Sequence, residues 1–90
     1  MKHMKLSVRI RGEWFAVPCI DASDQTIRWL GAEALRRYQK LKPATHVPDT
    51  EETIYEIRKT QGGAILDPDD FIDDVLDDND FVSVGNNYIT

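Results

Sequence analysis

Apolar and polar side chains alternate strictly over residues 5–11 of this 90-residue chain. Side chains in a strand point alternately to two faces, so the pattern predicts a strand with one buried and one outward face. A turn at Gly12-Glu13 returns the chain into a second strand over residues 14–20, in which Pro18 marks a sheet edge or the strand's end. Three basic residues are expected to share the outward face of the first strand: Lys5, Arg9 and Arg11.

Capping and periodicity signals predict two helices. Ser23 or Asp24 caps a long helix that runs to about residue 41, with apolar residues recurring every three or four positions. A short helix begins at Asp67-Pro68, because aspartate caps a helix and proline suits the first helical position. Phe71 and Val75 are expected to anchor this short helix to the core, with Ile72 as a third candidate.

Three further strands are expected at residues 53–59, 64–66 and 81–84. The order of hairpin, helix, strand, strand, short helix and strand indicates an α+β fold of the ubiquitin-like β-grasp type. Its mixed sheet would carry one long helix and a short second helix. The expected core consists of Leu6, Val8, Ile10, Leu30, Ala34 or Leu35, Tyr38, Ile57, Phe71, and Val82 or Val84.

Length and composition favour one small domain that spans residues 4–84, after an added leader at 1–3 and before a loose tail at 85–90. The single cysteine cannot form an internal disulfide. No apolar run approaches the roughly 20 residues that a membrane helix requires. A cytoplasmic location is therefore expected.

Charge is distributed unevenly along the chain. Residues 1–60 hold all eleven Lys and Arg against eight acids, a formal charge of +3, whereas residues 61–90 hold eight acids and no Lys or Arg. All eight of these acids are aspartates between Asp67 and Asp80. A fold could convert this asymmetry into two faces of opposite charge.

The aspartates do not match a site for chemistry. A twelve-residue calcium loop starting at Asp67 would have Phe71 at a ligand position and Ile72 where glycine is needed. Catalytic carboxylates need a cleft, and an exposed amphipathic turn offers none. Cys19 in a strand is expected to be a buried apolar residue. We predict no catalytic, cofactor-binding or metal-binding residue, and no nucleic-acid binding, because the acidic third would repel phosphate.

Several motifs resemble a known family. They are Met4-Lys5, Val17-Pro18-Cys19, Arg37-Tyr38, Gly62-Gly63 followed by Ile65-Leu66-Asp67-Pro68-Asp69-Asp70, and Asp74-Val75 followed by Asp77-Asp78. Together they resemble the N-terminal oligomerisation domain of the partitioning-defective PDZ scaffolds that organise animal cell polarity. The resemblance spans roughly residues 4–84. Ala64 is an extra residue relative to that family, and Trp14-Phe15-Ala16 replaces a run of small branched residues.

The resemblance implies a Phox/Bem-like fold and front-to-back polymerisation, in which a basic hairpin face docks on the acidic face of the next copy. Electrostatics would fix orientation and register. The acidic face would comprise Asp67, Asp69, Asp70, Asp73, Asp74, Asp77 and Asp78. The basic face would comprise Lys5, Arg9 and Arg11, and apolar contacts would come from Trp14 and Ala16.

The expected partner is the chain itself, or related scaffold domains, in the cytoplasm at the cell cortex or cell junctions. No small-molecule substrate is expected, and membrane contact would be indirect, through a longer protein. Two other readings stay open. The domain could bind a different Phox/Bem-like protein through one face, or it could bind a small GTPase through its edge strand.

Overall fold

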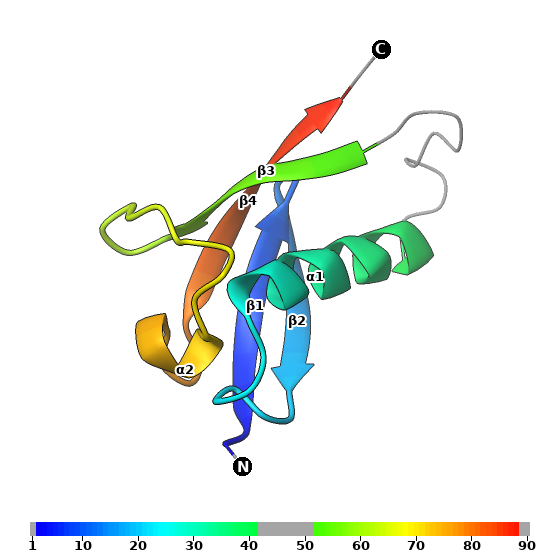
Figure 1. Ribbon diagram of the computed structural model, residues 1–90. Helices are drawn as coiled ribbons and strands as arrows, with labels where there is room; N and C mark the ends of the chain where they lie inside the picture. Colours follow the sequence, from blue (N-terminus) through cyan, green and yellow to red (C-terminus); the bar gives the residue numbers. More distant parts are fainter. Residues whose placement is uncertain (1, 42–51, 89–90) are drawn as a thin grey trace.

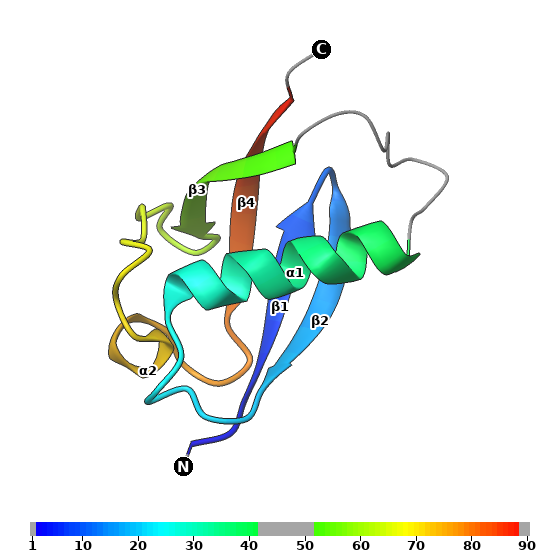
Figure 2. The ribbon, with the colours of Figure 1, turned by 45° about the vertical axis from the view of Figure 1, so that its right-hand side comes forward.

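The computed structural model describes residues 2–41 and 52–88. Four strands form one mixed sheet, and a helix, α1 (Ile27–Leu41), lies across one face of it (Figure 1, Figure 2). The strands are β1 (Met4–Ile10), β2 (Glu13–Cys19), β3 (Glu52–Lys59) and β4 (Phe81–Tyr88). A short helix, α2 (Ile72–Val75), completes the α+β fold that the order of elements predicts.

The strands are ordered β2-β1-β4-β3, so β2 and β3 form the two edges. β1 pairs antiparallel with β2 and parallel with β4, while β3 and β4 are antiparallel. The edge position of β2 agrees with Pro18, which has no amide hydrogen for a second neighbour. β4 pairs with β3 as far as Tyr88, so residues 85–88 continue a strand and are not the loose tail that was expected.

The hairpin turn lies one residue earlier than predicted. Its central residues are Arg11 and Gly12, with φ of 52° and 80°, and β2 already begins at Glu13. Positive φ at both central residues is the type I′ arrangement, whose twist matches that of the flanking strands. Gly12 adopts this conformation without steric cost, whereas Arg11 is a less common residue there.

α1 begins later than predicted, at Ile27, and its cap is Thr26 instead of Ser23 or Asp24. The Thr26 hydroxyl accepts a hydrogen bond of 3.2 Å from the Trp29 amide, as an N-cap side chain does. The helix buries one stripe against the sheet, as its periodicity predicts: Ile27, Leu30, Gly31, Ala34 and Tyr38.

The segment after β3 differs most from the prediction. Residues 64–66 form no strand, since only an isolated bridge joins Ile65 to Arg58. Pro68 lies in a turn that the Asp67 carboxylate closes by accepting from the Asp69 amide at 2.9 Å, and α2 starts only at Ile72. The Asp67 side chain thus stabilises a turn that precedes α2 in the chain.

Phe71 does not anchor the short helix, which corrects the predicted core. Its side chain is 42% exposed, whereas the neighbouring Ile72 is fully buried and Leu76 nearly so. The start of α2 at Ile72 sets this orientation, because residues four apart share one helix face, and here that face carries Ile72 and Leu76.

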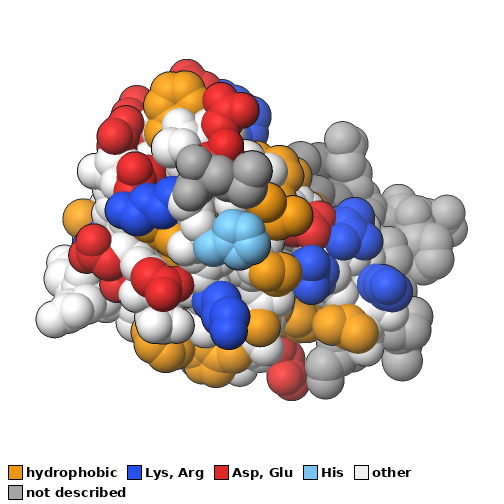
Figure 3. Space-filling view, turned by 90° about the horizontal axis from the view of Figure 1, so that it is seen from below, with side chains coloured by type: hydrophobic (Ala, Val, Ile, Leu, Met, Phe, Trp, Pro, Cys, Tyr) orange, Lys and Arg blue, Asp and Glu red, His pale blue; other side chains and the backbone are white. Residues whose placement is uncertain are grey.

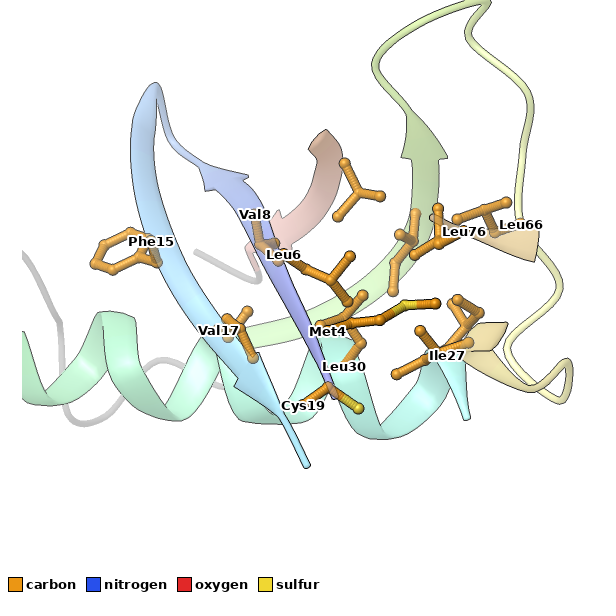
Figure 4. Close-up of a cluster of buried hydrophobic side chains, with 14 of the residues drawn as sticks. Met4, Leu6, Val8, Phe15, Val17, Cys19, Ile27, Leu30, Leu66 and Leu76 are labelled. Atoms are coloured by element: carbon orange, nitrogen blue, oxygen red, sulfur yellow. The ribbon is translucent and has the colours of Figure 1, made fainter. Parts of the chain in front are cut away.

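The remaining core prediction is confirmed. Leu6, Val8, Ile10, Leu30, Ala34, Tyr38, Ile57 and Val82 are buried. Side chains from β1, β2, α1 and the chain around Leu66 and Leu76 point toward one another between the helix and the sheet (Figure 4). Cys19 belongs to this cluster, as expected, and its thiol donates to Gln25 Oε1 at 2.9 Å.

Candidate functional site

Residues 67–80, here called the acidic segment, are tied to the rest of the domain mainly through backbone hydrogen bonds. The amides of Ile72 and Asp73 donate to the carbonyls of Gln25 and Ala22, at 2.9 and 2.8 Å. At its other end the Asn79 amide donates to the Lys5 carbonyl at 2.8 Å. The segment is therefore an ordered surface, anchored at both ends by groups far away in the sequence.

Three of its carboxylates hold the backbone of the domain. Asp67 closes the turn before α2, and Asp78 Oδ1 accepts from the Lys5 amide at 2.8 Å. Asp80 Oδ2 accepts from the Asp77 amide at 2.8 Å. Hydrogen bonds from backbone amides to carboxylates are charge-assisted, so these three carboxylates help to hold the fold, Asp78 by joining two segments far apart in the sequence.

Three carboxylates form ion pairs with basic side chains of the same chain. Asp69 pairs with Arg28 at 2.7 Å, Asp73 with Lys2, and Asp80 with Lys59 at 3.6 Å. Asp73 raises the pKa of Lys2, first through the hydrogen bond and then through its charge, and Asp69 raises the pKa of Arg28 in the same way. These pairs neutralise part of the acidic segment internally.

Three aspartates remain after this accounting. Within the described part of the chain, the side chains of Asp70, Asp74 and Asp77 make no hydrogen bond or ion pair, and all three residues are exposed. We call these three residues the open acidic group. Their carboxylates face solvent, and of the three only the charge of Asp77 adds to the raised pKa of Lys2.

Most basic side chains of the described residues are also paired. Glu33 binds Arg36 at 2.7 Å and Arg37 at 3.2 Å, and Arg36 above all lowers the pKa of this carboxyl to about 2. Arg58 binds Glu56 at 2.7 Å. Arg11 aside, the described basic residues that have no carboxylate partner are Lys5, Arg9 and Lys40.

Lys5 and Arg9 lie on the outer face of β1, opposite α1, as the alternation predicts. They are separated by about 13 Å along the strand, at roughly 3.3 Å per residue. Lys5 adjoins the acidic segment through its backbone bonds to Asp78 and Asn79, whereas Arg9 is at the far end of the strand.

Arg11 does not share this face, which corrects the prediction. It lies in the turn beyond β1, and its guanidinium donates to the Tyr38 hydroxyl at 2.9 Å. The guanidinium carbon is also 5.6 Å from the centre of the Tyr38 ring. Because Tyr38 belongs to α1, Arg11 reaches toward the helix side of the sheet.

The outer face also carries two large aromatic side chains. Trp14 is 46% exposed and Phe81 is 51% exposed, and their rings meet edge-to-face at 5.3 Å. The Arg9 guanidinium lies 5.9 Å from the Trp14 ring centre. Ala16 is exposed on the same strand as Trp14. Seen from below, acidic side chains gather mainly on the left and at the top, and hydrophobic ones along the lower rim (Figure 3).

The described residues also form a groove, but they contain no cluster of metal ligands. A groove of about 460 Å³ runs beside α1, lined mainly by apolar side chains such as Leu35, Ile57 and Leu66. Among the described residues, no three His, Cys, Asp or Glu side chains are close enough to hold a metal ion. No helix in the described ranges is long and apolar enough to span a bilayer.

The exposure of Phe81 and of Phe71 was not predicted from the sequence. The first could have been found from alternation, because an inward Val82 places Phe81 on the outer face. The second could not, because it depends on where α2 begins.

The family described as the N-terminal of Par3 and HAL proteins matches residues 4–86. The chain is 43% identical over 81 residues to a histidine ammonia-lyase of Bos taurus and 41% identical to that of Homo sapiens. It is 39% identical over 77 residues to partitioning defective 3 homolog B of Mus musculus. The motifs in the sequence indicated a partitioning-defective relative but not the histidine ammonia-lyases.

These matches cover 86–89% of this chain but only a small part of each relative. The chain spans 12% of the two ammonia-lyases and 6% of the partitioning-defective homolog. The shared feature is thus a small domain that occurs in proteins of different size and type. Since the family match covers nearly the whole of it, this chain belongs to the family of N-terminal domains of Par3 and HAL proteins.

Proposed function

We propose that this domain is a self-associating module in which the outer face of β1 of one copy docks on the acidic segment of the next. The observation that supports the proposal is the separation of unpaired charges. Among the described residues, the side chains of Asp70, Asp74 and Asp77 make no hydrogen bond or ion pair, and Lys5 and Arg9 have no carboxylate partner. A second copy supplies the complement of each group.

A contact between two different faces of identical molecules is heterologous. After one junction has formed, one copy keeps an unused acidic face and the other keeps an unused basic face, so assembly continues into a filament unless the rotation closes a ring. The exposed charges would set orientation and encounter rate more than affinity. The part of the affinity that these charges supply should fall as salt rises, because charges at a solvated junction are screened beyond about 10 Å at 0.1 M salt.

Within the predicted acidic face, we propose that the open acidic group carries most of the attraction. Asp67, Asp69, Asp73 and Asp78 contribute less, since each already binds a backbone amide or a basic side chain. On the basic side we propose Arg9 and Lys5 as the principal residues. Arg11 is left with a supporting role through its contact to Tyr38.

The module itself is proposed to be non-catalytic, to need no cofactor and to act by joining copies of a longer protein. A role in a cell-polarity scaffold is supported by the partitioning-defective relative. The ammonia-lyase relatives support an alternative setting, in which the same module would associate subunits of an enzyme. Self-association is common to both proposals and is tested first.

The test mixes two variants that each block one face. Asp77→Lys disables the acidic face and leaves the outer face of β1 intact, and Arg9→Asp does the reverse. Each variant alone should sediment as a monomer with an unchanged circular dichroism spectrum. Mixed in equal amounts, they should form one junction and yield a dimer that does not grow.

Lys40→Asp is the matched control, because Lys40 has no carboxylate partner among the described residues and lies at the end of α1, away from the outer face of β1. It should assemble like the parent. A parent that stays monomeric at millimolar concentration would contradict self-association and favour binding to a different protein. Two single variants that stay monomeric when mixed would contradict docking between unlike faces.

A further inference from the structure

Exposed aromatic side chains occur on both surfaces that the proposed junction brings together. Trp14 and Phe81 are 46% and 51% exposed on the outer face of the sheet, and Phe71 is 42% exposed in the acidic segment. Single exposed apolar residues are ordinary, but an exposed pair of contacting aromatics is typical of a binding surface. Aromatic residues and arginine are also enriched where interfaces concentrate their energy.

On the outer face, Phe81 has a basic residue on either side along the strand direction. The register pairs Phe81 with Ser7 of β1, and Lys5 and Arg9 lie two residues before and two residues after Ser7. Trp14 is paired with Arg9 across β1 and β2, and its ring reaches the Phe81 ring at 5.3 Å. Phe81 thus lies between two basic residues along the strand direction, and Trp14 lies beside one of them, Arg9.

In the acidic segment the pattern is the same with the opposite charge. Phe71 follows Asp70 directly, and Asp74 lies one helical turn later, its amide donating to the Phe71 carbonyl at 3.0 Å. Neither carboxylate has a partner in the described part of the chain. An exposed aromatic ring is thus placed between two anions.

We propose that Phe71 of one copy packs against the Trp14–Phe81 pair of the next copy and forms the apolar centre of the junction. This inference rests on the proposed self-association and names the residues that give it affinity. The ring contact brings Asp70 and Asp74 toward Lys5 and Arg9, and it shields these pairs from water.

The experiment uses the mixed dimer, in which the Asp77→Lys copy supplies the outer face and the Arg9→Asp copy supplies the acidic segment. Trp14→Ala in the Asp77→Lys copy should weaken dimerisation about 30-fold, the size expected for an interface hot spot. Phe71→Ala in the Arg9→Asp copy should weaken it about tenfold. The dissociation constants are measured by sedimentation at several salt concentrations.

The control is the same substitution placed in the other copy of the mixed dimer. Trp14→Ala in the Arg9→Asp copy, or Phe71→Ala in the Asp77→Lys copy, alters a face that the dimer does not use and reports only on folding. Leu41→Ala, at an apolar residue 62% exposed at the end of α1, is the matched surface control. The salt dependence should persist in the Trp14 variant, because the facing charges are retained.

The outcomes separate the two proposals. A mixed dimer whose affinity changes less than about twofold on Trp14→Ala overturns the aromatic contact and leaves charge-directed association standing. An equal loss wherever Trp14→Ala is placed also overturns it, since the effect is then one of folding. A mixture that never dimerises overturns both proposals.

Discussion

The Arg28 guanidinium donates a hydrogen bond of 2.7 Å to the Asp69 carboxylate and joins α1 to the acidic segment. The two side chains are 67% and 79% exposed, so the pair is screened by water. Next to it, the Arg28 amide donates to the Pro68 carbonyl at 2.9 Å, which holds the same two elements together through the backbone. We therefore expect the pair to contribute little to the stability of the fold. Its main effect is to neutralise one negative charge of the acidic segment.

Asp69→Asn should change the free energy of unfolding by less than about 0.5 kcal/mol, because exposed pairs contribute little. It should also weaken self-association less than Asp74→Asn, since Asp69 is already neutralised and Asp74 is not. Urea unfolding and sedimentation of the two variants check the two statements. Equal losses of association in the two variants would contradict the proposal that an aspartate paired within its own chain contributes less to the junction.

Ile72→Ala should destabilise the domain by about 2–5 kcal/mol, the usual cost of a cavity at a fully buried aliphatic side chain. Phe71→Ala should change stability by less than about 1 kcal/mol, because its ring is 42% exposed. Thermal and urea melts of both variants make the comparison. A Phe71 variant as unstable as the Ile72 variant would show that the Phe71 side chain is part of the core.

The Cys19 thiol should react with Ellman's reagent at pH 8 at least about tenfold more slowly in the folded protein than in denaturant. Burial raises the pKa of this thiol, which lowers the fraction of reactive thiolate, and the side chain is only 1% exposed. Absorbance at 412 nm follows the reaction. Rapid labelling under native conditions would mean that the end of β2 opens readily.

Glu33 should make a small contribution to stability that depends on acid pH. Its carboxyl has a pKa of about 2 in the fold, below the ordinary 4.5, so the contribution is present above pH 4.5 and is lost as pH falls toward 2. Glu33→Gln should cost a few tenths of a kcal/mol at pH 7 for each lost pair with Arg36 and Arg37. Urea melts at pH 7 and pH 2 should show this difference shrinking at the lower pH.

Local patterns in the sequence determined the hairpin, the buried stripe of α1 and the separation of charge along the chain. Alternation places Lys5 and Arg9 outward because side chains in any strand alternate, whatever the strand packs against. A three- and four-residue recurrence puts Leu30, Ala34 and Tyr38 on one helix face for the same kind of reason. These features depend only on neighbours within a few residues.

Tertiary structure alone decided which charges and aromatics remain available. Lys2 reaches Asp73, and Arg28 reaches Asp69, across 71 and 41 residues of sequence, so no local pattern distinguishes these aspartates from Asp70 or Asp74. The start of α2 turned Ile72 inward and Phe71 outward, because hydrogen bonds to the carbonyls of Gln25 and Ala22 fix where that helix begins. Composition produced the acidic surface, but long-range contacts decided which of its carboxylates are paired within the described part of the chain.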